Sequence, residues 1–502
     1  MRIKSATFQS DKNKDSIHLL ILLTITLCIG VYLISTTVLI AKDGVTFIEY
    51  AQKLSSDAIA VMVSEDQHPG YPFLILTAHR MAKIASGSAS IWSWIYSAQF
   101  MALAFRLLTV TVLYFVGKEI VGPKLSFLAI LILILLPKPA GYGSDALSDW
   151  PYLFFLASGF LLLIRGALNK KWWQFGFAGL AAGSGYLVRP ECAQLVVFGS
   201  LWTAWQLWGA KRTIARDKAV FMLALLLVGF FIPAVPYMKL KGAIFPKKDV
   251  GQFGFSILDS RFSPNIEHQV SSFAPKNMAK AFDELIEEIG DTLMWFFGPA
   301  LLLGAYEYFR QRNWHKPQKF FTAVLIALNV ALMIWLFCKY DYISGRHILP
   351  LVVFTIFFVP IGLQIFGNWL RAMFCKSRLE SNQDSHLWFS TLVIAGLAIC
   401  TPKLLTPIRA EKHSYREAAR WFANHTDQKD IIAVPDARIS FYAQREGLNW
   451  TAGQIPEQAQ YAVRIFEEDN QPTVPEQLGK VEYKYVDKKN ERVSLVIYRK
   501  QP

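Results

Sequence analysis

The chain has 502 residues, of which 53% are hydrophobic and only 18% are charged, and its formal net charge is +14. Soluble proteins carry about 25% charged residues, so this composition excludes an ordinary soluble protein. Most of the basic residues fall in short loops between hydrophobic segments, which is typical of the cytoplasmic loops of membrane proteins rather than of nucleic-acid binding. The five cysteines show no paired spacing, so no disulfide or metal site is predicted from them. We expect a polytopic α-helical protein that contacts membrane lipids and no nucleic acid.

The first hydrophobic segment, at about residues 17–41, is long enough to cross a bilayer, which takes about 20 apolar residues. Four basic residues precede this segment, so the N-terminus is expected in the cytoplasm. The segment has no small-residue cleavage site and is too long for a signal peptide, so it is expected to remain as an anchor. Asp43 then emerges at the outer surface of the membrane.

Eleven segments are predicted to span the membrane, because this count places the basic loops on one side. A twelfth candidate, residues 73–85, contains His79, Arg80 and Lys83. A charge near the bilayer centre costs at least about 2.5 kcal/mol, so this piece is predicted to lie on the outer surface as an amphipathic helix, as are residues 45–54. The predicted spans are approximately 17–41, 92–117, 124–137, 150–166, 172–188, 191–208, 218–238, 291–308, 320–337, 347–370 and 386–404.

The chain is predicted to contain two domains, a transmembrane domain at residues 1–404 and an extracytoplasmic α/β domain at residues 405–502. The second domain has a helical period followed by a short apolar strand and a hairpin pattern. These three elements lie at residues 415–423, at 431–434, and at 481–486 with 493–498. Two further pieces, residues 42–91 and 239–290, are also expected outside.

The candidate site residues lie in these outer loops. Asp43 is a candidate base, because a carboxylate at an apolar boundary has a raised basicity; the alternative is a helix N-cap. Arg346 is a candidate phosphate ligand, since a guanidinium donates two parallel hydrogen bonds; the alternative is an interfacial anchor. Arg189 and Glu191 lie in an outward turn between two spans and are also candidate site residues. The alternative is that these two side chains only pair with each other.

Further acids and a histidine accompany these residues. Asp145 and Asp149 flank the outer mouth between the third and fourth predicted spans, and both lie on the same side of the membrane as Asp43. The three acids can therefore share a pocket. The alternatives are that Asp145 and Asp149 are solvated loop acids or that Asp149 is a helix cap. His68 opens the second surface helix, where the adjacent prolines are ordinary but the histidine is not explained.

Six motifs follow one another along the chain: Lys42-Asp43-Gly44 with residues 47–51, residues 68–72, Ser148-Asp149, residues 179–191, residues 344–350, and residues 416–434 followed by Phe441-Tyr442-Ala443. In this order they resemble the GT-C glycosyltransferases, specifically the bacterial branch related to protein O-mannosyltransferases and lipid A aminoarabinose transferases. The resemblance covers most of the chain, and it rests on the ordered set of motifs rather than on any single one.

The resemblance implies a donor sugar on a polyprenyl phosphate and an acceptor hydroxyl, on a lipid, glycan or protein, at the outer face. Asp43 corresponds to the family's first-loop catalytic acid and Arg346 to the basic residue beside the donor phosphate. Many relatives follow the loop acid directly with Glu, whereas this chain has Gly44. The full predicted site contains Asp43 as catalytic residue; Arg346, Arg189 and His347 as phosphate ligands; and His68, Glu49, Asp145, Asp149, Glu191 and Tyr342 in the pocket.

We therefore expect a hexosyl- or pentosyltransferase of the cytoplasmic membrane that inverts the anomeric centre. No cofactor is expected, because the leaving group is already a phosphate; a divalent metal stays an open alternative. One alternative function is a lipid or glycan transporter or flippase, which predicts charges deep within several spans, of which Arg106 is the clearest. Another is a non-catalytic scaffold, which predicts that Asp43 is freely replaceable.

Overall fold

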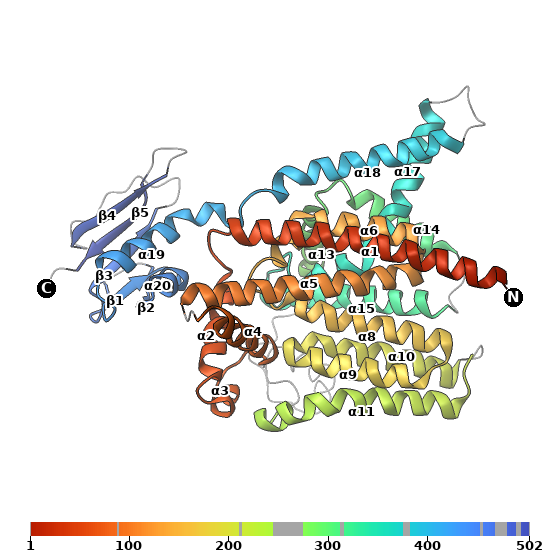
Figure 1. Cartoon of the computed structure of the whole chain (residues 1–502), viewed down its shortest axis with the longest axis horizontal. Helices are drawn as coiled ribbons and strands as arrows, with labels where there is room; N and C mark the ends of the chain where they lie inside the picture. Colours follow the sequence, from red (N-terminus) through yellow and green to blue (C-terminus); the bar gives the residue numbers. More distant parts are fainter. Residues whose placement is uncertain are drawn as a thin grey trace.

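The computed structural model describes residues 2–87, 90–209, 213–243, 275–311, 316–374, 382–451, 455–466, 479–487 and 493–500. Long helices run side by side along the longest axis of the molecule, and a small sheet domain lies at one end (Figure 1). The predicted fold class is confirmed, since the chain is an α-helical membrane protein with a small C-terminal α/β domain. Most of the predicted outer loop at 239–290 lies outside the described residues.

Each of the eleven predicted spans contains a helix. Within the described ranges, seven helices are long and apolar enough to cross a bilayer, so the count of eleven stays a prediction. The helices are α1 (Arg2–Thr36), α5 (Ile91–Val121), α6 (Pro123–Leu135), α8 (Asp149–Asn169), α9 (Trp172–Val188), α10 (Gln194–Trp208), α11 (Arg216–Lys241), α14 (Gly298–Arg310), α15 (Pro317–Tyr340), α16 (Leu349–Thr355) with α17 (Val359–Phe374), and α18 (Asn382–Leu404). Two other helices, α7 (Pro137–Tyr142) and α13 (Pro275–Thr292), lie between them in the sequence.

Glycines allow α9 and α11 to pack with their backbones in close approach. A Cβ atom added at Gly179 would lie 2.2 Å from the carbonyl oxygen of Leu226, and one at Gly183 would lie 2.3 Å from that of Phe230. Small residues at helix interfaces are a general means of association in membranes, where burial of apolar surface does not drive helices together. The close packing holds the turn after α9, which carries Arg189, in a defined place.

Three short helices lie beside the sheet domain at the same end of the bundle: α2 (Lys42–Leu54), α3 (Ala58–Ser64) and α4 (Gly70–Ser86) (Figure 1). Helix α2 is amphipathic as predicted, since it buries Phe47, Ile48 and Ala51 and exposes Glu49 and Lys53. Helix α4 exposes apolar side chains to the surroundings, among them Phe73, Met81 and Ile84. That pattern suits a helix at a membrane surface.

The C-terminal domain is a five-stranded sheet in the order β2-β1-β3-β5-β4. Strand β1 pairs in parallel with β2 and β3, and β5 pairs antiparallel with β3 and β4. Its elements are α19 (His413–His425), β1 (Ile431–Val434), α20 (Ala437–Ala443), β2 (Glu446–Asn449), β3 (Tyr461–Ile465), β4 (Lys480–Val486) and β5 (Val493–Arg499). The helix, the buried strand and the hairpin predicted here are confirmed, whereas β2 and β3 were not predicted.

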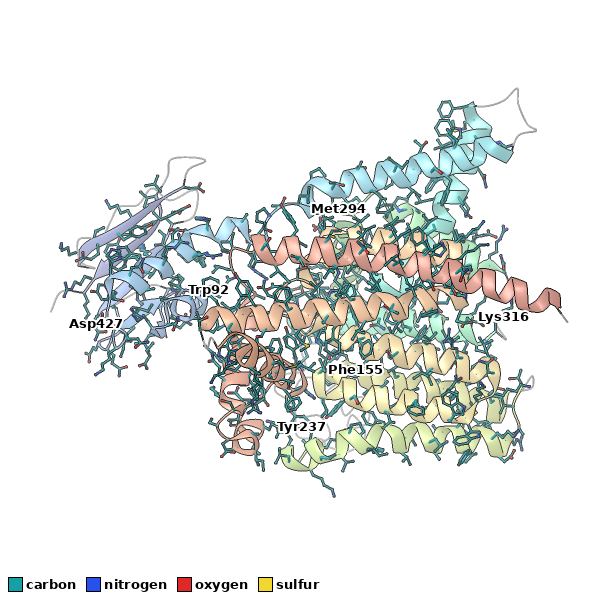
Figure 2. The ribbon with its side chains drawn as sticks, viewed as in Figure 1. Trp92, Phe155, Tyr237, Met294, Lys316 and Asp427 are labelled. Carbon is teal, nitrogen blue, oxygen red and sulfur yellow. The ribbon has the colours of Figure 1, made fainter. Side chains whose placement is uncertain are left out.

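The predicted topology is tested by cysteine labelling. Figure 2 shows Lys316, in a basic loop, at the end of the bundle opposite to Asp427 in the sheet domain. In a protein without its native cysteines, Lys83→Cys on α4 and Lys480→Cys on β4 are expected to react with an impermeant thiol reagent added outside intact cells. Lys316→Cys is expected to react only after permeabilisation. Labelling of either of the first two only from the cytoplasmic side contradicts the topology.

Candidate functional site

A cavity of about 550 Å³ opens where the short helices meet the bundle. Its walls come from the starts of α2 and α8, from α7, from the turns before α4 and after α9, and from the loop before α16. The lining residues are Asp43, Phe47, Gln67, His68, Tyr142, Ser148, Val188, Arg189, Pro190, Glu191, Tyr342, Ser344, Arg346 and His347. Seven of the ten site residues predicted from the sequence are among them: Asp43, His68, Arg189, Glu191, Tyr342, Arg346 and His347.

A continuous chain of charges connects the arginines of this cavity through Asp149. The Asp149 side chain is 1% exposed, and its Oδ1 accepts a hydrogen bond of 2.7 Å from Arg189 Nη1. Its Oδ2 accepts a hydrogen bond of 3.0 Å from Nε of Arg346 and forms an ion pair with Nη2 of the same side chain, also at 3.0 Å. The remaining terminal nitrogen of Arg346 donates to Asp43 Oδ2 at 2.5 Å. Asp149 thus orients both guanidinium groups from behind the cavity.

Neither of the two acids in this chain of charges acts as a helix cap. Ala41 is the N-cap residue of α2, and Asp43 lies in the first turn, where a negative charge is favoured by the helix dipole. Asp149 is the first helical residue of α8, and Ser148 is the N-cap residue. Arg189 is not committed to a pair with Glu191 alone, because its Nη1 donates to Asp149.

The electrostatic environment sets different protonation preferences for the two basic residues before α16. Burial lowers the pKa of Arg346, but the carboxylates of Asp149 and Asp43 more than offset this effect and raise it above its usual range. Burial and the charges of Arg189 and Arg346 lower the pKa of His347. The backbone N–H of Ser344 donates to His347 Nδ1 at 3.3 Å, so neutral His347 carries its proton on Nε2. At neutral pH the cavity therefore presents charged Arg346 beside neutral His347.

Comparison with known proteins identifies the fold. Residues 67–237 match the family model described as dolichyl-phosphate-mannose-protein mannosyltransferase, and no curated protein matches the chain. The fold is similar to that of ArnT from Cupriavidus metallidurans bound to undecaprenyl phosphate, with a TM-score of 0.58, 12% identity, and coverage of 95% of this chain and 97% of that one. It is also similar to the archaeal oligosaccharyltransferase AglB from Archaeoglobus fulgidus, in complex with an inhibitory peptide and a dolichol-phosphate, with a TM-score of 0.57, 12% identity, and coverage of 91% and 70%.

The chain has the GT-C fold, which it shares with these two proteins. The resemblance predicted from the ordered motifs is therefore confirmed. The residues matched by the family model include His68, Asp149 and Arg189, whereas Asp43 and Arg346 lie outside the matched range.

Within this GT-C fold, two of the predicted pocket residues lie away from the cavity. Asp145 is buried, and its two oxygens accept hydrogen bonds from Arg409 Nη1 at 2.5 Å and from the backbone N–H of Ala41 at 3.0 Å. Glu49 is exposed on the surface of α2 and does not line the cavity. The expectation that either acid lines the pocket is therefore corrected. Their positions in the sequence did not reveal which way their side chains face.

The glycine at position 44 has a steric reason. A Cβ atom added at Gly44 would lie 2.8 Å from both the Cβ atom and the carbonyl oxygen of Ala146. Contacts this short force the backbone to shift, so an acidic side chain does not fit at this position. Glu191 and Asp43 are the acids that line the cavity itself.

The sequence did not single out several residues that line the cavity. Ser148 and Ser344 belong to the motifs that carried the resemblance, and Gln67 directly precedes His68, so position in these motifs was an available signal. Tyr142 lies on α7, beyond the end of the third predicted span, and it had no such signal. His68 itself packs between aromatic rings, with centroids 5.0 Å from that of Tyr186 and 5.2 Å from that of Tyr237.

The lowered pKa of His347 is testable by NMR titration of protein labelled with ¹³C at histidine Cε1. We expect its midpoint below the ordinary value of 6.5. Arg189→Gln is expected to raise the midpoint and Glu191→Gln to lower it further, because the two charges act with opposite sign. Since the unfolded chain binds this proton at a higher pH than the folded chain does, His347 makes folding less favourable as the pH falls below 6.5. A wild-type midpoint at or above 6.5 contradicts this description.

Proposed function

We propose that this protein transfers a sugar from a polyprenyl-phosphate-linked donor to an acceptor hydroxyl at the outer face of the cytoplasmic membrane. The observation that carries the proposal is the cavity in which Arg189 and Arg346 face a carboxylate, Asp43, at the end of a bundle of membrane-spanning helices. Two structures with the same fold are complexes, one with undecaprenyl phosphate and the other with a dolichol-phosphate. In this topology the N-terminus is cytoplasmic, and the cavity and the C-terminal domain are extracytoplasmic.

The donor phosphate is proposed to lie against Arg189, Arg346 and His347. Asp149 already holds both guanidinium groups, so little side-chain freedom is lost when an anion binds. The neutral imidazole of His347 has its Nε2 proton available for donation, because Nδ1 accepts from Ser344. The phosphate competes with Asp43 for the terminal nitrogen of Arg346. Donor binding therefore loosens the ion pair that otherwise occupies Asp43.

The proposed chemistry is a direct displacement at the anomeric carbon. The acceptor oxygen attacks this carbon while Asp43 takes the hydroxyl proton, and the bond from the carbon to the phosphate oxygen breaks. The electron pair leaves with the polyprenyl phosphate, whose added negative charge is stabilised by Arg346 and Arg189. Because attack comes from the side opposite to the leaving group, the configuration inverts. The reaction as written includes no metal ion, since the leaving group is a phosphate.

The other polar side chains of the cavity are proposed to contact the sugar. His68, Glu191 and Tyr342 line the cavity together with Gln67. Their donors and acceptors match the hydroxyl groups of a hexose or pentose. The acceptor, whether lipid, glycan or protein, is proposed to approach at the rim, where the Asp43 side chain is 54% exposed.

The hydrogen bonds of the buried Arg106 side chain support a structural role for this residue rather than a role in transport. Its Nη2 donates to the carbonyl oxygen of Ile134 at 2.9 Å, and its Nη1 donates to that of Ala140 at 3.4 Å. Carbonyls at the end of a helix such as α6 lack partners within the helix, so Arg106 satisfies them. Its guanidinium also lies 5.6 Å from the ring centre of Trp150.

The base role of Asp43 is tested by Asp43→Asn, which keeps the size of the side chain and removes its basicity. We expect a folded, membrane-inserted protein whose turnover is lowered by about 10²–10⁴-fold, the usual worth of general-base assistance. The measurement is sugar transfer by purified protein with a defined lipid-linked donor and acceptor. Glu49→Gln is the matched control, since this acid lies on the same helix outside the cavity and its loss is expected to leave turnover unchanged. Near-native transfer by Asp43→Asn contradicts the base role and makes Asp43 a structural residue.

The phosphate role of Arg346 is tested by donor binding rather than by turnover. Arg346→Ala is expected to weaken the affinity for a polyprenyl phosphate by roughly tenfold or more, because a charge-assisted bidentate contact is lost. Arg346→Lys is expected to restore only part of the affinity, since an ammonium group lacks the planar fork. Arg420→Ala, at an exposed arginine of the C-terminal domain, is the control. An unchanged dissociation constant in the alanine variant removes Arg346 from the donor site.

A further inference from the structure

The chain between α1 and α2, residues 37–41, has an irregular backbone even though most of it is buried. Leu39 and Ile40 are fully buried, and Ala41 is 5% exposed. We call these five residues the strap. Buried backbone N–H and C=O groups need hydrogen-bond partners, and an irregular segment cannot supply them from within itself as a helix does. The partners of the strap come largely from the C-terminal domain and its linker.

The first part of the strap is held by Arg416 and Ile408. Arg416, on α19, donates through Nη1 to the carbonyl oxygens of Thr37 at 3.1 Å and Val38 at 3.0 Å. The backbone N–H of Val38 donates to the carbonyl oxygen of Ile408 at 3.1 Å. The guanidinium of Arg416 also lies 5.0 Å from the ring centre of Trp92, on α5, which restricts its position from the bundle side.

The second part of the strap is held by two other elements of the same domain. The backbone N–H of Ile40 donates to the hydroxyl of Tyr442 at 3.0 Å, and Arg438 Nη1 donates to the Ile40 carbonyl oxygen at 3.5 Å. Arg409 Nη1 donates to the Leu39 carbonyl oxygen at 3.2 Å and also binds Asp145. The backbone of Arg409 has a φ of 56°, in the left-handed region that non-glycine residues rarely adopt, so the turn that directs this side chain is itself strained.

The strap leads directly into the first turn of α2. The backbone N–H groups of Gly44 and Val45 donate to the carbonyl oxygen of Ala41, at 3.0 and 3.3 Å. Asp145 accepts from the N–H of the same Ala41 at 3.0 Å. The position of the Asp43 carboxylate relative to Arg346 therefore depends on where the strap ends.

We propose that the C-terminal domain is a positioning element of the transferase, and that Arg416, Arg438, Tyr442 and Arg409 set the place of Asp43 through the strap. This inference rests on the proposed function. A general base acts only within hydrogen-bond reach of the proton it removes, and a misplacement of about 1 Å costs roughly 10²-fold in rate. The donor contacts of Arg189, Arg346 and Asp149 come from other elements. The domain therefore affects the chemical step without weakening donor binding.

Arg416→Ala separates these two effects. We expect turnover to fall by roughly tenfold or more, while the dissociation constant for a polyprenyl phosphate stays within about twofold of the wild-type value. Arg416→Lys is expected to recover part of the turnover, because an ammonium group reaches one of the two carbonyls. Arg420→Ala is the matched control one turn further along α19, where the side chain is exposed and pairs with Glu417. Native turnover in Arg416→Ala overturns the proposal, as does a parallel loss of donor affinity.

Amide hydrogen exchange supplies a readout that does not depend on activity. In Arg416→Ala the amides of residues 38–48 are expected to exchange faster, while those of residues 348–355, behind Arg346, are expected to stay at the wild-type rate. Unchanged exchange across residues 38–48 overturns the positioning role. If the wild-type protein transfers no sugar, the proposed function fails, and the exchange pattern alone then decides whether the domain holds the strap.

Discussion

The buried carboxylate of Asp149 is the interaction on which the arrangement of the site depends. A buried charge is tolerated only when it is paired and hydrogen-bonded, and here both oxygens are used, one by Arg189 and the other by Arg346. Removing one partner of such a buried pair typically costs about 3–5 kcal/mol. The same contacts join the start of α8, the turn after α9 and the loop before α16. The pairing therefore brings together three segments that lie far apart in the sequence.

The charges along this chain of residues balance without a ligand. Arg189 and Arg346 carry two positive charges, and Asp149 and Asp43 carry two negative ones. The partners differ in exposure, because Asp149 is 1% exposed and Asp43 is 54% exposed. An incoming phosphate therefore displaces Asp43 more easily than Asp149. In the proposed reaction this difference makes Asp149 a fixed support and Asp43 the group that becomes available.

The C-terminal domain supports the site from outside the cavity. It contacts the backbone of the strap and not the cavity wall. Its arginines donate to the carbonyl oxygens of the strap, and the strap ends where α2 begins. None of these arginines lines the cavity. A domain whose described residues do not line the cavity is thus connected to Asp43 by a short path of hydrogen bonds, which gives it a role in geometry rather than in binding.

The sequence alone determined the helical membrane architecture. The length of the hydrophobic segments and the positions of the charged residues both follow from the cost of burying charge in lipid. The sequence also indicated most of the cavity residues, since they belong to the motifs that carried the resemblance. Only the tertiary structure showed that Asp149 and Asp145 have different partners. The two acids are four residues apart in the sequence, but Asp149 binds Arg346 and Asp145 binds Arg409. The tertiary structure likewise revealed Arg416 and Arg438, whose partners are backbone carbonyls more than 370 residues away. A carbonyl group is common to every residue, so no side-chain pattern predicts which one an arginine binds.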